Sequence, residues 1–145
     1  MKRFIIGVLA LIFVCGLMAG GCSTTSKQDM TAADFVKEAK QNVCEVTVSQ
    51  AKEILDKGDH LFLDCREPKE YKMGHVPGAI NLPRGLLEFK IAKTVPNKED
   101  NILIYCKSGG RGCLSACTLC RMGYKHVKNM AGGWKAWEKA GYPIE

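Results

Sequence analysis

The segment that decides the fold is Ile102-Leu103-Ile104-Tyr105-Cys106-Lys107-Ser108-Gly109-Gly110-Arg111. Its first four residues form a short, continuous apolar run, which predicts a buried central strand. A glycine-bearing turn follows, and then a helical pattern that continues to about Met122 and ends at Gly123. Cys106 therefore stands between the end of a strand and the start of a helix. Because open parallel sheets bind ligands outside the carboxyl ends of their strands, this position suits a nucleophile.

Short β-type runs alternate with helical patterns on both sides of this segment. The further expected strands are 46–48, 61–63 and 79–81 before it and 127–129 after it, and the expected helices are 49–56, a stretch after Pro83, and 133–139. This alternation is typical of β-α units around a parallel sheet. We therefore expect the α/β class.

The first 21 residues predict a signal peptide of the lipoprotein type. Lys2 and Arg3 precede an apolar stretch at 4–18, which small residues follow. Residues 17–22 resemble the lipobox of bacterial lipoproteins, which makes Cys22 the lipidated residue. We expect an exported protein, periplasmic or at the cell surface, held to a bacterial membrane by that lipid. Ordinary secretory cleavage and an uncleaved anchor are the alternatives.

Residues 22–45 are expected to form a tether and a short helix, ahead of one folded domain at 46–145. Residues 23–28 have too little apolar content to pack, and Thr31 with Asp34 predicts a helix start. The formal net charge is +6, but the basic residues are scattered and do not alternate with aromatic residues. We expect no nucleic-acid partner, and only a weak attraction for small anions.

The loop from Cys106 to Arg111 has the composition of an anion-binding site. Its small residues, Ser108, Gly109 and Gly110, let backbone N–H groups turn inward, and the following helix adds its positive N-terminal end. Both effects favour a thiolate, so we expect the pKa of Cys106 to lie below about 8.5. The same amides would stabilise a persulfide on Cys106, while Lys107 and Arg111 would attract an anionic donor such as thiosulfate.

Four ordered motifs resemble the rhodanese family of sulfurtransferases. They are residues 63–68, 71–83, 106–111 and 132–137. The resemblance implies a five-stranded parallel sheet flanked by helices on both faces. It also implies a catalytic cysteine, Cys106, that cycles through a persulfide, a sulfur-binding loop at Lys107 to Arg111, and supporting roles for Asp64 and Arg66. No metal or organic cofactor is expected.

The function we expect is transfer of sulfane sulfur from a donor such as thiosulfate to a thiophilic acceptor, cyanide or a thiol, by a monomer. The alternative is a membrane-tethered persulfide carrier or thiol redox partner with little turnover of its own. Its motivation is Gly112, where many relatives have Ser, together with the cysteine-rich helix that follows.

Two other catalytic mechanisms are less well supported by the sequence. A phosphatase or arsenate reductase of related fold also uses a Cys and an Arg around an oxyanion, but the four residues between Cys106 and Arg111 give the smaller ring of the sulfur-handling members. The second alternative is a catalytic Cys-His-Asp triad formed by Cys106, His75 and Asp64. A histidine before a Pro-Gly turn more often bonds to backbone, and Asp64 is expected to fix loop geometry while Arg66 pairs with a carboxylate.

The remaining cysteines support three interpretations. Cys113, Cys117 and Cys120 share one side of a predicted helix. They could be small packing residues, they could include a resolving thiol for Cys106, with Cys113 or Cys65 the candidates, or they could bind a metal, for which their spacing is weak support. Burial is the default for Cys65, and spacing alone assigns no disulfide.

Overall fold

The computed structural model describes residues 29–145. The predicted signal peptide, the lipidation site Cys22 and residues 23–28 lie outside this range, so what concerns them stays a prediction. None of the helices within it has the length and apolar character needed to cross a membrane.

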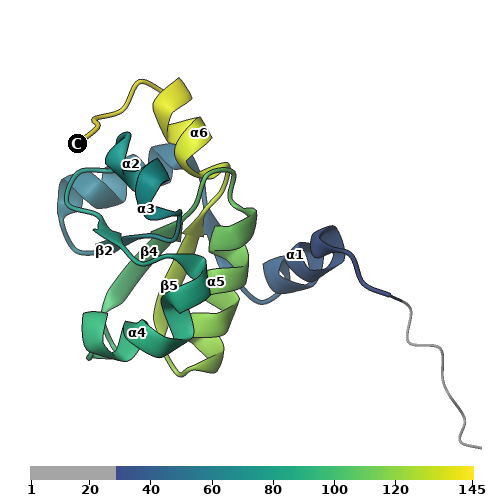
Figure 1. The fold of residues 1–145 in the computed structure, drawn as a ribbon. Coiled ribbons are helices and arrows are strands. Elements are labelled where there is room, and N and C mark those ends of the chain that lie inside the picture. Colours follow the sequence, from purple (N-terminus) through teal and green to yellow (C-terminus); the bar gives the residue numbers. More distant parts are fainter. Residues whose placement is uncertain (1–28) are drawn as a thin grey trace, which may run out of the picture.

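A five-stranded parallel sheet forms the centre of the molecule (Figure 1). Its order is β1-β5-β4-β2-β3, which places the predicted central strand β4 in the middle. The strands are β1 (Cys44–Val46), β2 (Leu61–Asp64), β3 (Ile80–Asn81), β4 (Asn101–Tyr105) and β5 (His126–Met130). The predicted α/β class and the rhodanese-like architecture are confirmed.

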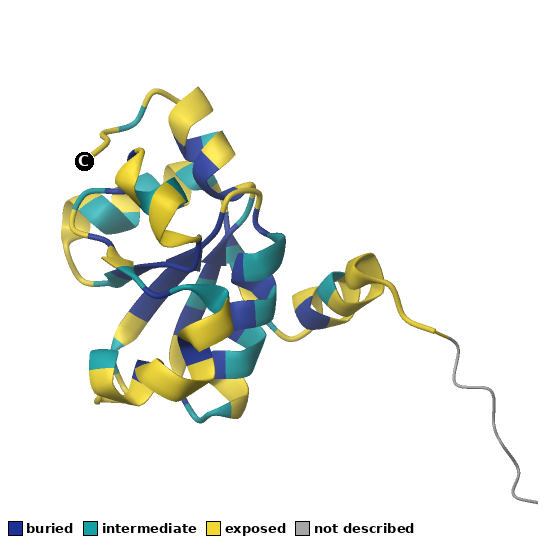
Figure 2. Ribbon diagram, viewed as in Figure 1, coloured by how far each residue is buried: buried dark blue, intermediate teal, exposed yellow. Residues whose placement is uncertain are grey.

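Side chains alternate along β4 between two layers of core, as expected for a strand buried on both faces. Ile102 and Ile104 pack on the side of α4 (Leu87–Thr94) and α5 (Gly110–Arg121). Leu103 and Tyr105 pack on the other side. There the sheet is covered by α2 (Val48–Lys57) and α6 (Gly133–Lys139). Buried residues therefore run along the strands and the inner sides of the helices (Figure 2).

The expected first strand at 46–48 is wrong. The strand is Cys44–Val46, so the sheet begins inside the segment expected to be a tether and a short helix. Thr47 caps α2 instead: its side chain accepts from the N–H of Gln50, and the Gln50 side chain accepts from the N–H of Thr47. This capping box begins the helix at Val48.

Three further elements complete the fold. Helix α1 (Ala32–Lys40) begins at the predicted cap, where Thr31 and Asp34 form a capping box. It packs beside α5. A single 3-10 turn (Arg84–Leu86) precedes α4. Helix α3 (Pro68–Lys72), which follows β2, was not expected from the sequence because five residues are too few to show a helical period.

Candidate active site

Cys106 lies at the carboxyl end of β4, in a loop whose backbone amides point at its sulfur. The N–H of Gly109 donates to Cys106 Sγ at 3.2 Å, and the N–H groups of Gly112 and Ser108 also contact it. Gly109 adopts the positive φ of +97° that this tight turn requires. The loop thus directs several partial positive charges at one atom, at the start of α5.

The pKa of Cys106 is lowered to about 5. The largest cause is a hydrogen bond from the side chain of Cys65, and the amides of Gly112, Ser108 and Gly109 add to it against the opposing effect of burial. This pKa favours the thiolate at neutral pH, the form in which a cysteine can act as a nucleophile.

Cys65 is the residue after β2, and it lies beside Cys106. The strand register pairs Asp64 with Tyr105, and the N–H of Cys65 extends the ladder by donating to the carbonyl of Tyr105 at 2.9 Å. The pKa of the Cys65 thiol is raised well above its usual value, first by the neighbouring Cys106 and then by burial. Of the two sulfurs, Cys106 carries the charge, since the loop amides point at it alone.

The N-terminus of α6 supports the loop from behind. The N–H of Trp134 donates to the carbonyl of Cys106 at 2.8 Å, and that of Lys135 donates to the carbonyl of Lys107 at 3.0 Å. Gly133 has a φ of +56°, and a Cβ there would overlap the carbonyl of Cys106. Glycine at 133 is thus required both by its conformation and by the close approach of two backbones.

Asp64 and Arg66 form a buried ion pair next to this arrangement. Arg66 Nη2 lies 2.6 Å from Asp64 Oδ2, and Arg66 is 2% exposed. The guanidinium also donates to the carbonyl of Gly74 at 2.7 Å and lies 4.6 Å from the ring centre of Trp134. Arg66 thus pairs with a carboxylate, as expected, and the pair also contacts α6. It makes no hydrogen bond to Cys106 Sγ within the described residues.

Arg111, the last loop residue, is held by a partner that the sequence did not single out. Its Nη2 donates to both carboxylate oxygens of Glu70, at 3.2 and 3.1 Å. Glu70 lies on α3, so this short helix positions the loop cation. Lys107 and Ser108 are exposed, whereas Gly109 is buried and Gly110 and Arg111 are partly buried.

His75 takes no part in a catalytic triad. Its Nδ1 lies 3.2 Å from the carbonyl of Tyr71, and its ring stacks on that of Tyr71. The carboxylate of Asp64, the other residue required, binds Arg66. The interpretation that this histidine bonds to backbone is confirmed.

The sequence of this chain is similar to those of known proteins. The rhodanese-like domain family matches residues 47–140. The chain belongs to the rhodanese-like family. It is 34% identical over 116 residues to thiosulfate sulfurtransferase 18 of Arabidopsis thaliana, covering 72% of this chain and 85% of that protein. It is 42% identical over 74 residues to the thiosulfate sulfurtransferase PspE of Escherichia coli, covering 51% and 70%.

A solved structure from Rhodopseudomonas palustris shares the fold with a TM-score of 0.73 and 34% identity, covering 80% of this chain and 95% of that one. It is described as a protein of unknown function and a possible tyrosine phosphatase. The family is therefore shown, while the reaction has to be argued from the site.

Gly112 of this rhodanese-like domain faces Asn129 of β5. A Cβ at Gly112 would overlap Asn129 Oδ1 and lie 3.3 Å from the N of Cys106. Asn129 is fully buried, and its amide donates to Glu45 Oε1 at 2.8 Å and, more weakly, to the carbonyl of Gly109 at 3.4 Å. Asn129 thus fills the space that a side chain at 112 would need.

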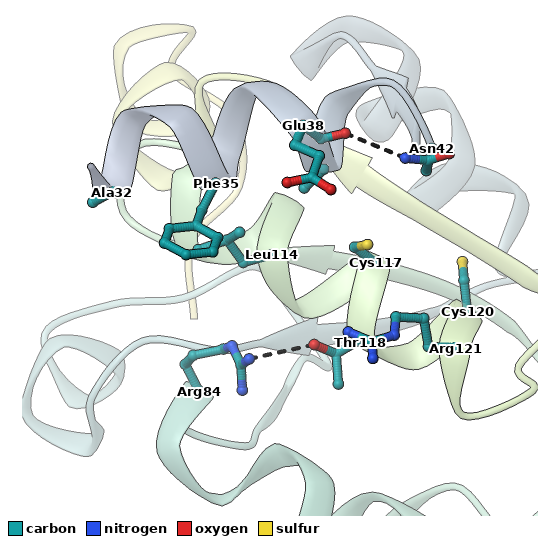
Figure 3. A pocket seen from close by; sticks show the side chains of 11 residues that line it. Ala32, Phe35, Glu38, Asn42, Arg84, Leu114, Cys117, Thr118, Cys120 and Arg121 are labelled. Atoms are coloured by element: carbon teal, nitrogen blue, oxygen red, sulfur yellow. Dashed lines mark hydrogen bonds between the residues drawn. The ribbon is translucent and has the colours of Figure 1, made fainter. Parts of the chain in front are cut away.

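The helix cysteines of the rhodanese-like domain differ in their surroundings. Cys113 is fully buried, whereas Cys117 and Cys120 line a groove of about 850 Å³ between α1 and α5. Figure 3 shows them with Phe35 and Leu114. Residues 106–111 do not line this groove. Within 29–145, no three His, Cys, Asp or Glu side chains are gathered as metal ligands would be.

Proposed function

We propose that this chain is a sulfurtransferase that carries sulfur on Cys106. The observation that supports it most is the Cys106 thiolate inside a ring of loop amides, with a pKa lowered to about 5. Such a ring stabilises negative charge both on the free thiolate and on a persulfide one atom further out. The site residues of the proposal are Cys106 as nucleophile and Lys107, Ser108, Gly109, Gly110 and Arg111 as the loop that binds the transferred sulfur.

The proposed cycle has two displacement steps. The Cys106 thiolate attacks the outer sulfur of thiosulfate, a Cys–S–S⁻ persulfide forms, and sulfite leaves with the electron pair of the broken S–S bond. Cyanide or a thiolate then attacks the outer sulfur of the persulfide, so that thiocyanate or a new persulfide leaves and the Cys106 thiolate returns. Both steps are nucleophilic substitutions at sulfur, so the proposal includes no metal and no organic cofactor.

The positive charges of the exposed Lys107 and the partly buried Arg111 attract the anionic donor to the loop. Thiosulfate carries two negative charges, and Arg111 is kept at the loop by Glu70. A guanidinium presents several N–H donors in a fixed plane, so the orientation that Glu70 gives Arg111 decides how well these donors bind the oxygens of thiosulfate.

Phosphoryl chemistry is the competing use of such a loop. Four residues separate Cys106 from Arg111, and the amides of Ser108, Gly109 and Gly112 already contact the thiolate. This closeness suits a single sulfur atom better than a tetrahedral phosphate. We therefore favour sulfur transfer, with thiosulfate as donor and cyanide or a thiol as acceptor.

The test of this choice is paired assays on the purified protein. We expect cyanide-dependent formation of thiocyanate from thiosulfate, its loss in Cys106→Ser, and no hydrolysis of p-nitrophenyl phosphate above background. Cys120→Ser is a matched control, because Cys120 is exposed on the far part of α5. Phosphate release that depends on Cys106, without thiocyanate, would replace this proposal with the competing one.

A second candidate function is a persulfide carrier with slow turnover of its own. The observation that favours it is the burial of Cys106, which is 1% exposed, since an acceptor must reach the sulfur. Single-turnover loading that is much faster than steady-state thiocyanate formation would support the carrier, and equal rates would remove it.

The proposed setting of the reaction is outside the cytoplasm, with a monomer anchored through lipid on Cys22. The support is the sequence pattern of residues 1–22. Labelling of the full chain with a fatty acid in a bacterial host tests the anchor, and we expect label in the native chain and none in Cys22→Ser. If neither protein is labelled, the lipid anchor is refuted, and secretory cleavage or an uncleaved anchor remains as the explanation of residues 1–22.

A further inference from the structure

The strand register places a second cysteine against the proposed nucleophile. Asp64 of β2 pairs with Tyr105 of β4, and Cys65 and Cys106 are the next residues along the two chains. The N–H of Cys65 bonds the carbonyl of Tyr105 at 2.9 Å, so the strands have not yet separated at this point. Neighbouring strands lie about 4.8 Å apart, within the range of about 4.4 to 6.8 Å between the Cα atoms of disulfide-bonded cysteines.

Both side chains also point to the same face of the sheet. Leu63 and Cys65 alternate with Asp64 on β2, and Ile104 and Cys106 alternate with Tyr105 on β4. All four lie in the core cluster on the α4 and α5 side, together with the helix residues that cover them. The two sulfurs therefore share one buried space.

We infer that Cys65 is a resolving thiol, which attacks the inner sulfur of the Cys106 persulfide and releases hydrosulfide when no acceptor arrives. This inference rests on the proposed sulfur transfer, because that reaction supplies the persulfide. The site then has a second activity, the reductive release of sulfide, besides transfer to an acceptor.

The atoms and electrons balance without an external oxidant. The Cys65 thiol and the Cys106 persulfide anion become a Cys65–Cys106 disulfide and HS⁻. The S–S bond inside the persulfide breaks, a new one forms between the two cysteines, and the proton of Cys65 goes to the departing sulfur. The two thiols are oxidised and the sulfane sulfur is reduced. A dithiol reductant then restores both cysteines by thiol–disulfide exchange.

The charge distribution explains why attack follows loading. While Cys106 is a thiolate, it accepts the hydrogen bond of Cys65 and cannot react with it. Once sulfur is loaded, the negative charge moves to the outer atom, which the loop amides of Gly109 and its neighbours favour. The inner sulfur becomes electrophilic and Cys65 loses its acceptor, so the same contact turns into an attack geometry.

Cys65 is also the better of the two candidates that the sequence offered. Cys113 is buried on α5, where the charges acting on its thiol are first those of Glu45 and Lys40 and last that of Cys106. Cys65 is buried in the same core cluster as Cys106, a cluster that does not include Cys113, so Cys106 is the thiol placed to react with it. Burial also raises the pKa of Cys65, and burial persists after loading, so the thiolate of Cys65 forms slowly and an acceptor has time to take the sulfur first.

The experiment loads the full chain with thiosulfate without oxygen, removes the donor, and follows free sulfide and intact mass without any acceptor. We expect the persulfide adduct of about 32 Da to give way to a species about 2 Da lighter than the reduced protein. One sulfide should appear per persulfide lost, and peptide mapping should find the peptides of Cys65 and Cys106 joined. In Cys65→Ser the adduct should persist at least about tenfold longer, since no internal thiol attacks it.

The matched control is Cys113→Ser, which replaces the other buried thiol and should release sulfide as the native chain does. Equal persulfide lifetimes in the native chain and Cys65→Ser, or a disulfide that excludes Cys65, would overturn the inference. If thiosulfate loads neither protein, the proposed transfer fails, and the resolving role is tested with persulfide installed by inorganic polysulfide. A Cys65–Cys106 disulfide must then form, and its absence in the native chain refutes the role.

Discussion

Loop amides and a neighbouring thiol act together on a single sulfur atom. The N–H groups that lower the pKa of Cys106 come from residues 108, 109 and 112, and the Cys65 side chain lowers this pKa more than any one of them. Burial opposes them, because a charged atom loses its water. The favourable contacts outweigh burial, so the pKa of Cys106 is lowered to about 5 although the residue is 1% exposed.

The pH dependence of the site follows from this balance. We expect the ultraviolet absorbance of the Cys106 thiolate to appear with a midpoint near pH 5 and to be lost below it, because the pKa is lowered to about 5. Sulfur loading at limiting thiosulfate should fall over the same range. In Cys65→Val, which lacks the donor, the midpoint should move up by about one unit or more. Subtraction of Cys106→Ser spectra isolates the signal, and an unchanged midpoint in Cys65→Val would show that the hydrogen bond contributes nothing.

Gly133 offers a second test at the level of one residue. Gly133→Ala places a methyl group against the carbonyl of Cys106 at a φ of +56°, so the loop or α6 must move. We expect a loss of stability of about 2 kcal/mol or more, by urea unfolding, and at least a tenfold loss of thiocyanate formation. Gly141→Ala is the matched control, because it has a similar φ of +69° but nothing within 4 Å. Equal losses of activity in both variants would argue against a tight loop contact.

At the level of elements, the short helix α3 supplies the carboxylate that pairs with the loop cation Arg111. It begins with Pro68 and is capped by Glu67 and Glu70, and Glu70 also binds Arg111. The same carboxylate thus caps the first turn of α3 and orients the loop that precedes α5.

Glu70→Gln tests the function of that contact. The amide keeps a similar size but removes the charge that holds Arg111, so we expect weaker thiosulfate binding, with a KM about three- to tenfold higher and a smaller change in kcat. Lys72→Gln, on the same helix, is the control for loss of a charge. A fall in kcat alone would indicate that Glu70 acts on the chemical step instead.

The sequence predicted most elements of the described fold, because caps and apolar runs are local. Thr31 caps the start of α1 as expected, and Gly133 begins α6 as expected. The first strand was misplaced because Val46, Thr47 and Val48 have β-type side chains, yet Thr47 forms a capping box. Local pattern could not choose between these two uses of one residue.

The loop around Cys106 was also predictable, and Cys65 was one of two candidate thiol partners, but the sequence could not show which residues contact the loop. The strand order brings β2 beside β4 although β3 and α4 separate them in the chain. Contacts of Cys65 with Cys106 and of Gly112 with Asn129 depend on this order. No spacing along the sequence records it, so these contacts appear only in three dimensions.

At the scale of the whole molecule, α6 couples the core to the site. Trp137 is fully buried on one face of the sheet, while the first turn of the same helix donates N–H groups to the carbonyls of Cys106 and Lys107. A change deep in this layer should therefore affect the loop.

Trp137→Ala should cost about 3 to 5 kcal/mol of unfolding free energy, measured in denaturant, because it leaves a large cavity. Thiocyanate formation should fall as well, at temperatures where the variant is still folded. Phe35→Ala on α1 is the comparison: this side chain is 50% exposed, so we expect a loss below about 1 kcal/mol and full activity. A folded Trp137→Ala protein with native activity would show that α6 does not support the site.

The central claim is that Cys106 carries sulfur, and intact mass spectrometry of the full chain with thiosulfate tests it most directly. We predict one adduct of about 32 Da, mapped to the peptide of Cys106, removed by cyanide and missing in Cys106→Ala. No adduct, or one that remains in Cys106→Ala, would contradict the account.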